Sequence, residues 1–230
     1  MQTQLTLGVG LKDDATFANF YAAENQQLIT ELKKIAMGAG ERFIYFCGGS
    51  GEGCTHLLQA VCHEANQHHL RSVYIPLENI RDFSPEMLDD LEMLDVICID
   101  DIHKIAGLPA WEEAFFHAYN RIHDANKKLI VTANALPNDL QFTLPDLQSR
   151  LNWGVIFQLQ SLSDTEKLHV LVMRAERRGM SLSEEVGKYI LNHCPRHMTT
   201  LFAALDTLDK ISLAAQRKLT IPFVKTVLQI

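Results

Sequence analysis

Residues 43–60 read FIYFCGGSGEGCTHLLQA, an apolar run followed by a glycine-rich turn and a second apolar-periodic segment. The turn keeps the spacing Gly-x-x-x-x-Gly-x-Thr from Gly48 to Thr55, between an expected strand and an expected helix. Glycines let backbone N–H groups face phosphate oxygens, and a helix N-terminus favours negative charge. The stretch therefore predicts a phosphate-binding loop, although a plain glycine turn shares its local pattern.

Cys54 stands where loops of this kind carry a lysine. A charge-assisted hydrogen bond is worth about 1.5–3 kcal/mol, so its loss weakens binding about ten- to hundredfold. The backbone donors remain, so a nucleotide still binds, whereas stabilisation of a phosphoryl-transfer transition state suffers more. We expect a nucleoside diphosphate of unspecified base to be retained, and weak or no ATPase activity by the chain alone.

A pair of carboxylates supports the nucleotide interpretation. The segment VICIDDIH at 96–103 is an apolar strand that ends in Asp100 and Asp101. Such a strand directs one carboxylate toward Mg²⁺, together with the hydroxyl of Thr55, and the other toward an attacking water. Alone, the pair is typical of a solvated strand end; after a glycine loop in this order, it favours a nucleotide site.

The arrangement of apolar segments predicts an α/β fold. β-rich runs alternate with segments of helical spacing, which is typical of a parallel sheet covered on both faces. The expected strands are 42–47, 72–77, 95–100, 128–134 and 154–159, and the expected helices between them are 54–68, 84–94 and 109–126. Ser84 and Pro85 are expected to begin the second of these helices.

Beyond residue 161 the strand-like runs stop and a small helical domain is expected. Ser163 and Glu166 form the pattern of a capping box, and Gly179 is suited to end the helix that follows. Further helices are expected at 182–194, 198–216 and 221–230. The expected domains are a flexible tail over 1–13, an α/β nucleotide-binding domain over 14–160 and a helical lid over 161–230.

Composition limits the classes of function. Lysine and arginine number 21 against 28 aspartates and glutamates, a formal charge of −7, which argues against a large DNA-backbone footprint. The five cysteines form no CxxC pair, as expected of reduced thiols. The N-terminus lacks the features of a secretory signal, and no apolar run reaches membrane-spanning length. We expect a soluble cytoplasmic protein.

Several segments resemble the AAA+ ATPases, and among them the bacterial replication initiator family DnaA. GGSGEGCTHLLQA is similar to the initiator pattern GGxGxGKTHLLxA, and LPDLQSRLNWG at 144–154 resembles its box VII. TFANFYAAENQQL at 16–28 and the segment 162–182 resemble the base-bordering segment and the start of the lid. The QLTL start, the ending AAQRKLTIPFVK and the lack of room for a DNA-binding domain resemble Hda, the regulatory paralogues of that family.

The resemblance implies a role for individual residues. Asp100 and Asp101 match the Walker B acids, Asn134 the sensor 1 position, Arg196 the sensor 2 arginine and Arg150 the arginine finger. Gln4, Leu5 and Leu7 resemble the short motif that docks on the replicative sliding clamp. The Walker A loop, with its following residue, is implied to hold nucleotide through Gly48, Gly49, Ser50, Gly51, Glu52, Gly53, Cys54, Thr55 and His56.

The resemblance also implies a function. It is negative regulation of replication initiation: an ADP- and Mg²⁺-bound AAA+ protein, with the sliding clamp loaded on DNA, provokes ATP hydrolysis by DnaA through an arginine supplied in trans. DNA is then contacted mainly through the clamp, and head-to-tail self-association is an additional expectation. The alternatives are an autonomous AAA+ motor or loader acting on DNA or a helicase, and a scaffold with a vestigial nucleotide site.

Several residues also have plainer interpretations. Arg150 suits a helix cap or an ion pair with Asp146, and Arg196 suits a solvated lid surface. The QLTL tetrapeptide is short enough to arise by chance. The spacing of His193, Cys194 and His197 matches no standard zinc pattern, so helix packing is expected there. The aromatic residues Phe115, Phe116 and Tyr119 are expected in the core.

Overall fold

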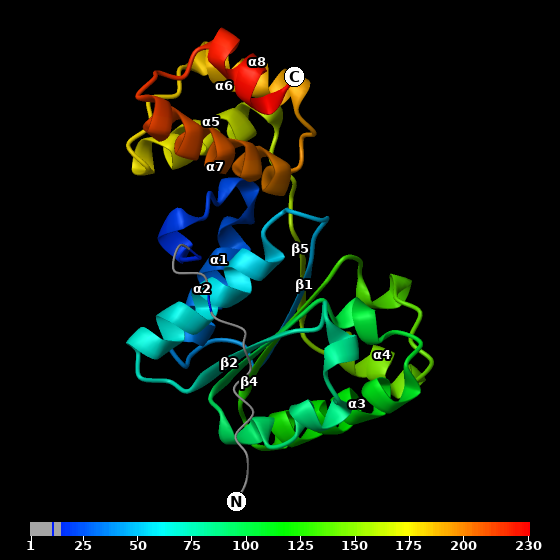
Figure 1. Cartoon of the computed structure of the whole chain (residues 1–230). Coiled ribbons are helices and arrows are strands. Elements are labelled where there is room, and N and C mark those ends of the chain that lie inside the picture. Colours follow the sequence, from blue (N-terminus) through cyan, green and yellow to red (C-terminus); the bar gives the residue numbers. More distant parts are fainter. Residues whose placement is uncertain (1–10, 12–14) are drawn as a thin grey trace, which may run out of the picture. The chain divides into compact units, whose positions relative to one another are not determined.

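The structure, a computed structural model, describes residue 11 and residues 15–230, which fold into two compact units (Figure 1). The first unit contains the described residues up to 49 together with 53–160. The second contains residues 50–52 and 161–230. The expected clamp-binding residues Gln4, Leu5 and Leu7 lie outside the described residues.

Within the described residues, the first unit is built on a five-stranded sheet in the order β2-β3-β4-β1-β5. Every neighbouring pair is parallel. The strands are β1 (Phe43–Cys47), β2 (Ser72–Pro76), β3 (Val96–Asp100), β4 (Lys128–Ala133) and β5 (Val155–Gln158). The parallel sheet predicted from alternating apolar and helical segments is confirmed.

Helices cover both faces of this sheet, because successive residues of each strand point to opposite sides. Ile44 and Phe46 pack with α1 (Gln26–Ala36) and α2 (Cys54–Gln67). Tyr45 packs on the other face, with α3 (Pro109–Asp124) and α4 (Pro145–Leu151). Figure 1 shows these two helix pairs on opposite sides of the strands. The result is two cores, which explains why the strands are almost wholly apolar.

The segment 84–94 corrects one expectation. It forms two short 3-10 turns, Pro85–Leu88 and Leu91–Met93, where a single helix was expected. Ser84 makes no side-chain cap hydrogen bond, and Asp90 adopts a left-handed backbone with φ of 59°. The paired aspartates at 89 and 90 interrupt the helix, while Leu88 and Leu91 are both buried.

Helix α1 is not among the helices expected from the sequence. Its signal is present in the residues: Leu28, Leu32 and Ile35 are buried at the spacing of one helical face. The helix begins within the segment 16–28, which resembles the base-bordering segment of the initiator family. Helix α1 packs beside α2 on the sheet face formed by Ile44 and Phe46.

The second unit is helical, with α5 (Asp164–Arg177), α6 (Glu184–His193), α7 (Met198–Ala215) and α8 (Ile221–Leu228). The predicted capping box at Ser163 and Glu166 is present, with Ser163 N donating to the Glu166 carboxylate at 2.8 Å. Gly179, which follows the C-cap residue Arg178 of α5, has φ of +73°, as expected of a helix-terminating glycine. In the part of the chain that the structure describes, no helix has the length and apolar character needed to cross a bilayer.

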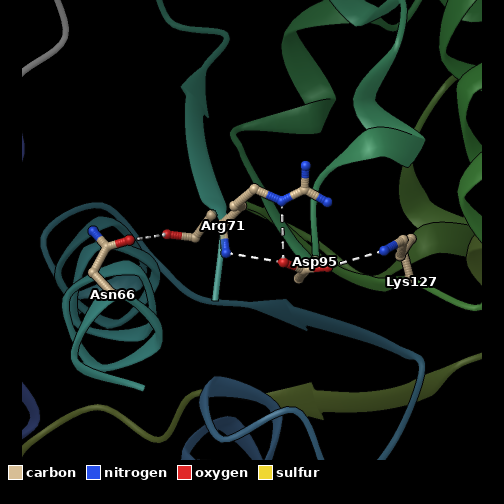
Figure 2. Close-up of polar contacts among 5 residues, drawn as sticks. Asn66, Arg71, Asp95 and Lys127 are labelled. Atoms are coloured by element: carbon tan, nitrogen blue, oxygen red, sulfur yellow. Dashed lines mark hydrogen bonds and ion pairs between the residues drawn. The ribbon is translucent and has the colours of Figure 1, made fainter. Parts of the chain in front are cut away.

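A polar cluster ties together the amino ends of three strands (Figure 2). Asp95, directly before β3, accepts a 3.0 Å hydrogen bond from the backbone N–H of Arg71 and a 2.9 Å bond from Lys127 Nζ. Arg71 and Lys127 directly precede β2 and β4. The Lys127 hydrogen bond, followed by the Arg71 amide, lowers the pKa of Asp95 to about 2. The cluster therefore links the amino ends of β2, β3 and β4, at the edge of the sheet opposite to the glycine loop.

Candidate functional site

The glycine loop leaves β1 and enters α2 at the carboxyl edge of the sheet. The backbone N–H of Gly48 donates to Ala133 O of β4 at 3.2 Å, which fixes the start of the loop. Gly53, directly before α2, has φ of +105°, and a Cβ there would lie 2.7 Å from the Phe20 ring. Only glycine accommodates that backbone and that approach. Gly53, the second fixed glycine of the spacing pattern, is thus required by the geometry.

Asp100, at the end of β3, is held by three hydroxyl groups. Thr55 Oγ1 and Tyr74 Oη donate to Asp100 Oδ2 at 2.7 and 2.8 Å, and Thr132 Oγ1 donates to Oδ1 at 2.5 Å. The residue is only 2% exposed. Thr55 and Asp100, predicted to meet at a magnesium site, therefore do meet. Tyr74 and Thr132 were missed by the sequence analysis; for Thr132, a polar side chain near the end of an apolar strand was the available signal.

Asp101 is partly exposed and has a left-handed backbone, with φ of 60°. Its backbone N–H lies 3.1 Å from Thr132 Oγ1, and His103 Nδ1 lies 3.9 Å from its carboxylate. Burial, followed by the neighbouring charge of Asp100, raises the pKa of Asp101 to about 6. The two adjacent carboxyl groups therefore occupy different surroundings, one fixed by hydroxyls and one less constrained.

The residues present fit a magnesium–nucleotide group. Mg²⁺ prefers oxygen ligands and usually binds through one or two protein groups plus phosphate oxygens. The Thr55 hydroxyl and the Asp100 carboxylate supply such oxygens on adjacent elements. The loop at 48–53 and the N-terminus of the 14-residue helix α2 supply backbone donors suited to phosphate. Cys54 is the first residue of that helix and is partly exposed.

Other residues expected to bind nucleotide lie around this loop. Asn134 is exposed and directly follows β4, next to Ala133, which pairs with Cys47 at the loop's start. The His56 ring donates through Nε2 to Thr16 O at 2.8 Å, and Phe20 packs at 5.6 Å from it. His56 therefore positions the segment that precedes α1. Its expected contact to nucleotide stays a prediction.

The second unit contains Arg196, the expected sensor 2 arginine. It is exposed, and its Nη1 lies 2.5 Å from the carboxylate of Asp164, the first residue of α5. The loop residue Glu52 groups with this unit and accepts a hydrogen bond from Ser161. Both residues of this ion pair belong to the lid. The position of the Arg196 side chain is therefore explained by its salt bridge to Asp164.

Arg150 lies in the last turn of α4, and its side chain is partly exposed. The guanidinium carbon stands 3.9 Å from the Trp153 ring centroid and 5.9 Å from that of Phe116. The structure therefore pairs Arg150 with aromatic rings, where an ion pair with Asp146 was the alternative. Leu147 and Leu151 are fully buried and anchor the helix in the core.

A buried carboxylate fixes the entry into α4. Glu112 of α3 is 0% exposed and accepts hydrogen bonds from the backbone N–H groups of Gly107, Thr143 and Leu144 at 2.7, 2.9 and 2.8 Å. Burial acts to raise the pKa of Glu112, but the hydrogen bonds led by Thr143 outweigh it and keep that pKa below its usual value. Glu112, which the sequence analysis did not identify, therefore positions the helix that carries Arg150.

The other expected side-chain clusters are structural. His193 stacks on Tyr189 with ring centroids 4.0 Å apart, and across the described residues no group of three or more His, Cys, Asp or Glu side chains is arranged to hold a metal ion. Phe115 and Tyr119 are buried, as predicted. Phe116 is only partly buried; it packs against the edge of the core, and its ring lies beside Arg150.

Comparison with known families accounts for both units. Residues 11–158 match the family model described as the bacterial DnaA ATPase domain. The chain belongs to the bacterial DnaA ATPase domain family. Residues 164–228 match a second model, described as the Hda lid domain, so the DnaA-type ATPase domain is followed here by an Hda-type lid. The resemblance drawn from the loop, box VII and lid segments is thereby confirmed.

Solved structures agree on the AAA+ fold of this DnaA-family chain. Domain III of the Thermotoga maritima replication initiation protein DnaA is 23% identical, with a TM-score of 0.84 over 96% of this chain and 98% of that one. AMPPCP-bound DnaA from Aquifex aeolicus is 21% identical, with a TM-score of 0.75 over 90% and 68%. A Thermotoga maritima RuvB variant is 16% identical, with a TM-score of 0.71 over 94% and 71%.

Proposed function

We propose that this chain is a nucleotide-bound negative regulator of replication initiation. In this proposal it acts with the DNA-loaded sliding clamp and stimulates ATP hydrolysis by the initiator DnaA. Membership of the DnaA ATPase domain family and the Hda-type lid support a role connected with replication initiation. The proposed parts are a clamp-binding tail over 1–13, a nucleotide domain over 14–160 and a lid over 161–230, in a protein of the cytoplasm.

The position of Arg150 carries the proposal. Its guanidinium group is held at the surface of the first unit by two aromatic rings and is not enclosed in the core. An arginine placed in this way is available to the nucleotide of a neighbouring subunit, where it stabilises charge on the γ-phosphate. Arginine fingers supplied in trans accelerate phosphoryl transfer by about 10³–10⁵-fold. A chain that hydrolyses ATP poorly itself is then still an effective activator.

The chain's own nucleotide, in this proposal, is retained and not turned over. AMPPCP is bound in the Aquifex aeolicus relative, and we extend nucleotide binding to this chain as ADP with Mg²⁺. The glycine loop, with Thr55 and Asp100, suits the diphosphate and the metal ion. Cys54 lacks the charge that a γ-phosphate requires, which disfavours hydrolysis.

Steady-state ATP hydrolysis by DnaA, with clamp and DNA present, tests the central step. Arg150→Ala should retain fold and nucleotide binding and lose most of the stimulation. Arg81→Ala, which removes another exposed arginine, is the matched control and should stimulate normally. Undiminished stimulation by Arg150→Ala would reject the finger and leave the scaffold interpretation.

The clamp contact needs its own experiment. Deletion of residues 4–7, which removes Gln4, Leu5 and Leu7, should abolish binding to immobilised clamp and leave nucleotide binding unchanged. Replacement of the same residues by a Gly/Ser sequence of equal length controls for tail length and should behave like the deletion. Wild-type clamp affinity in either variant removes the tail from the proposal.

An autonomous AAA+ ATPase is the second candidate. The hydrogen bond between Thr55 and Asp100 favours it, because a hydroxyl and a carboxylate placed together suit the Mg²⁺ ion that ATP hydrolysis requires. The two candidates differ in one measurement, the rate of ATP hydrolysis by the purified chain alone. Many turnovers without DnaA would support the motor or loader. Turnover that appears only when DnaA and DNA-loaded clamp are added supports the regulator.

A further inference from the structure

The end of α4 brings an exposed tryptophan over the functional arginine. Trp153 lies one turn after Arg150, and its backbone N–H donates to Arg150 O at 3.0 Å. Its ring centroid stands 3.9 Å from the guanidinium carbon, within the range of a close cation–π contact. Phe116 of α3 stands on the same guanidinium at 5.9 Å. Two aromatic rings from different elements therefore define where this side chain lies.

Trp153 is 61% exposed, yet its backbone is fixed on both sides. Gly154 approaches β1 so closely that a Cβ would lie 2.4 Å from the Phe43 ring and 2.8 Å from Phe43 O. On the other side, Asn152 Nδ2 donates to Gln148 O at 2.8 Å and to Asn138 Oδ1 at 3.0 Å. The backbone of Trp153 thus belongs to a constrained turn, while its exposed side chain adds little buried area to the core.

We propose that Trp153 is a positioning residue that preorganises Arg150, an inference that rests on the proposed function of that arginine. A free arginine side chain populates many rotamers, and fixing it during catalysis costs conformational entropy. A planar guanidinium stacks well on an aromatic face, so the ring restricts those rotamers in advance. Trp153 acts through Arg150 and touches no reacting atom itself.

The test measures initiator ATP hydrolysis against increasing concentration of the chain, with clamp and DNA present. Trp153→Ala should lower the maximal stimulated rate about two- to fivefold, the equivalent of about 0.5–1 kcal/mol at 1.4 kcal/mol per tenfold. The half-saturating concentration should stay unchanged. Trp153→Phe should restore most of the rate. Met93→Ala, at a comparably exposed apolar residue (62%), is the matched control and should have no effect.

Three results would overturn the inference. An unchanged rate in Trp153→Ala would mean that the stack has no role in catalysis. A shift of the half-saturating concentration with an unchanged maximal rate would make Trp153 a docking residue. A raised maximal rate would mean that the ring holds the arginine away from its target.

A measurement without a partner separates this inference from the proposed function. In wild-type protein the NMR signal of the Arg150 Nε–H proton should be shifted upfield by the indole ring, and Trp153→Ala should remove the shift. If Arg150→Ala itself leaves stimulation intact, the proposed function fails. If Arg150→Ala abolishes stimulation and Trp153→Ala leaves both the rate and the NMR signal unchanged, only the positioning inference fails.

Discussion

The Thr55 hydroxyl donates a 2.7 Å hydrogen bond to the Asp100 carboxylate, across 45 residues of sequence. The bond joins the first turn of α2 to the end of β3. Tyr74 and Thr132 hold the same carboxylate from the strands on either side. These are oxygen groups of the kind that Mg²⁺ prefers, and the neighbouring Cys54 stands where loops of this kind carry a lysine.

Restoring that lysine should separate metal binding from phosphate charge. We expect Cys54→Lys to raise the affinity for a nucleoside triphosphate about ten- to hundredfold, because one charge-assisted contact is regained. Intrinsic hydrolysis should rise as well. Titration with a fluorescent ATP analogue and steady-state phosphate release measure the two effects. Cys54→Met, a long but uncharged replacement, should change neither; equal gains in both variants would show that charge is not the missing component.

Removing the charge that fixes the entry into α4 should destabilise the protein. Glu112 is fully buried and its bonds from Gly107, Thr143 and Leu144 are charge-assisted. We expect Glu112→Gln to lower the free energy of unfolding by about 2–3 kcal/mol, measured by urea denaturation. Its neighbour Glu113 is 74% exposed at the side chain, so Glu113→Gln should lie close to wild type. Equal stability of the two variants would deny Glu112 this role.

The cluster at the amino edge of the sheet predicts a pH dependence of stability. The pKa of Asp95 falls from its usual 3.8 to about 2, chiefly through Lys127, so folding favours the ionised form. Its stabilisation is complete above about pH 4 and is lost as the pH falls toward 2. With the side chain 29% exposed, solvent screening limits this to about 1–2 kcal/mol.

Urea denaturation of Asp95→Asn measures that contribution. The variant should be less stable than wild type at pH 7, and the difference should shrink as the pH falls below about 4 and be small near pH 2. Asp124→Asn, at a side chain that is 83% exposed, provides the control and should show no such convergence. A difference that persists unchanged at low pH would assign the stabilisation to something other than the ionised carboxylate of Asp95.

Much of the fold follows from local patterns in the sequence. The strands and the glycine loop are continuous segments, so apolar runs and fixed spacing identify them. The segment 84–94 failed for the opposite reason: Ser84, Pro85 and the helical spacing after them suggested a helix, and the left-handed backbone of Asp90 interrupts it. The left-handed backbone conformation of this single residue ends the helix, although the spacing of the apolar residues favours one.

The missed site residues depend on tertiary register. Tyr74 and Thr132 belong to strands that flank β3, and their convergence on Asp100 requires the strand order and pairing. Glu112 meets Thr143 across 31 residues, and no spacing rule connects them. Trp153 is close to Arg150 in sequence, but only the direction of its ring shows that it faces the guanidinium. Local sequence patterns identify candidate site residues, but only the folded structure shows which side chains lie next to them.

The salt-bridged cluster of Arg71, Asp95 and Lys127 has a consequence for how freely this protein can change (Figure 2). It joins the amino ends of the three strands, at the edge of the sheet opposite to the glycine loop, so this edge is held by residues that lie outside the proposed nucleotide site. A side chain such as Cys54 can therefore vary in chemistry while the scaffold that presents Arg150 keeps its shape. The ion pairs that hold the strands together lie at the amino edge of the sheet, and the proposed nucleotide site lies at its carboxyl edge.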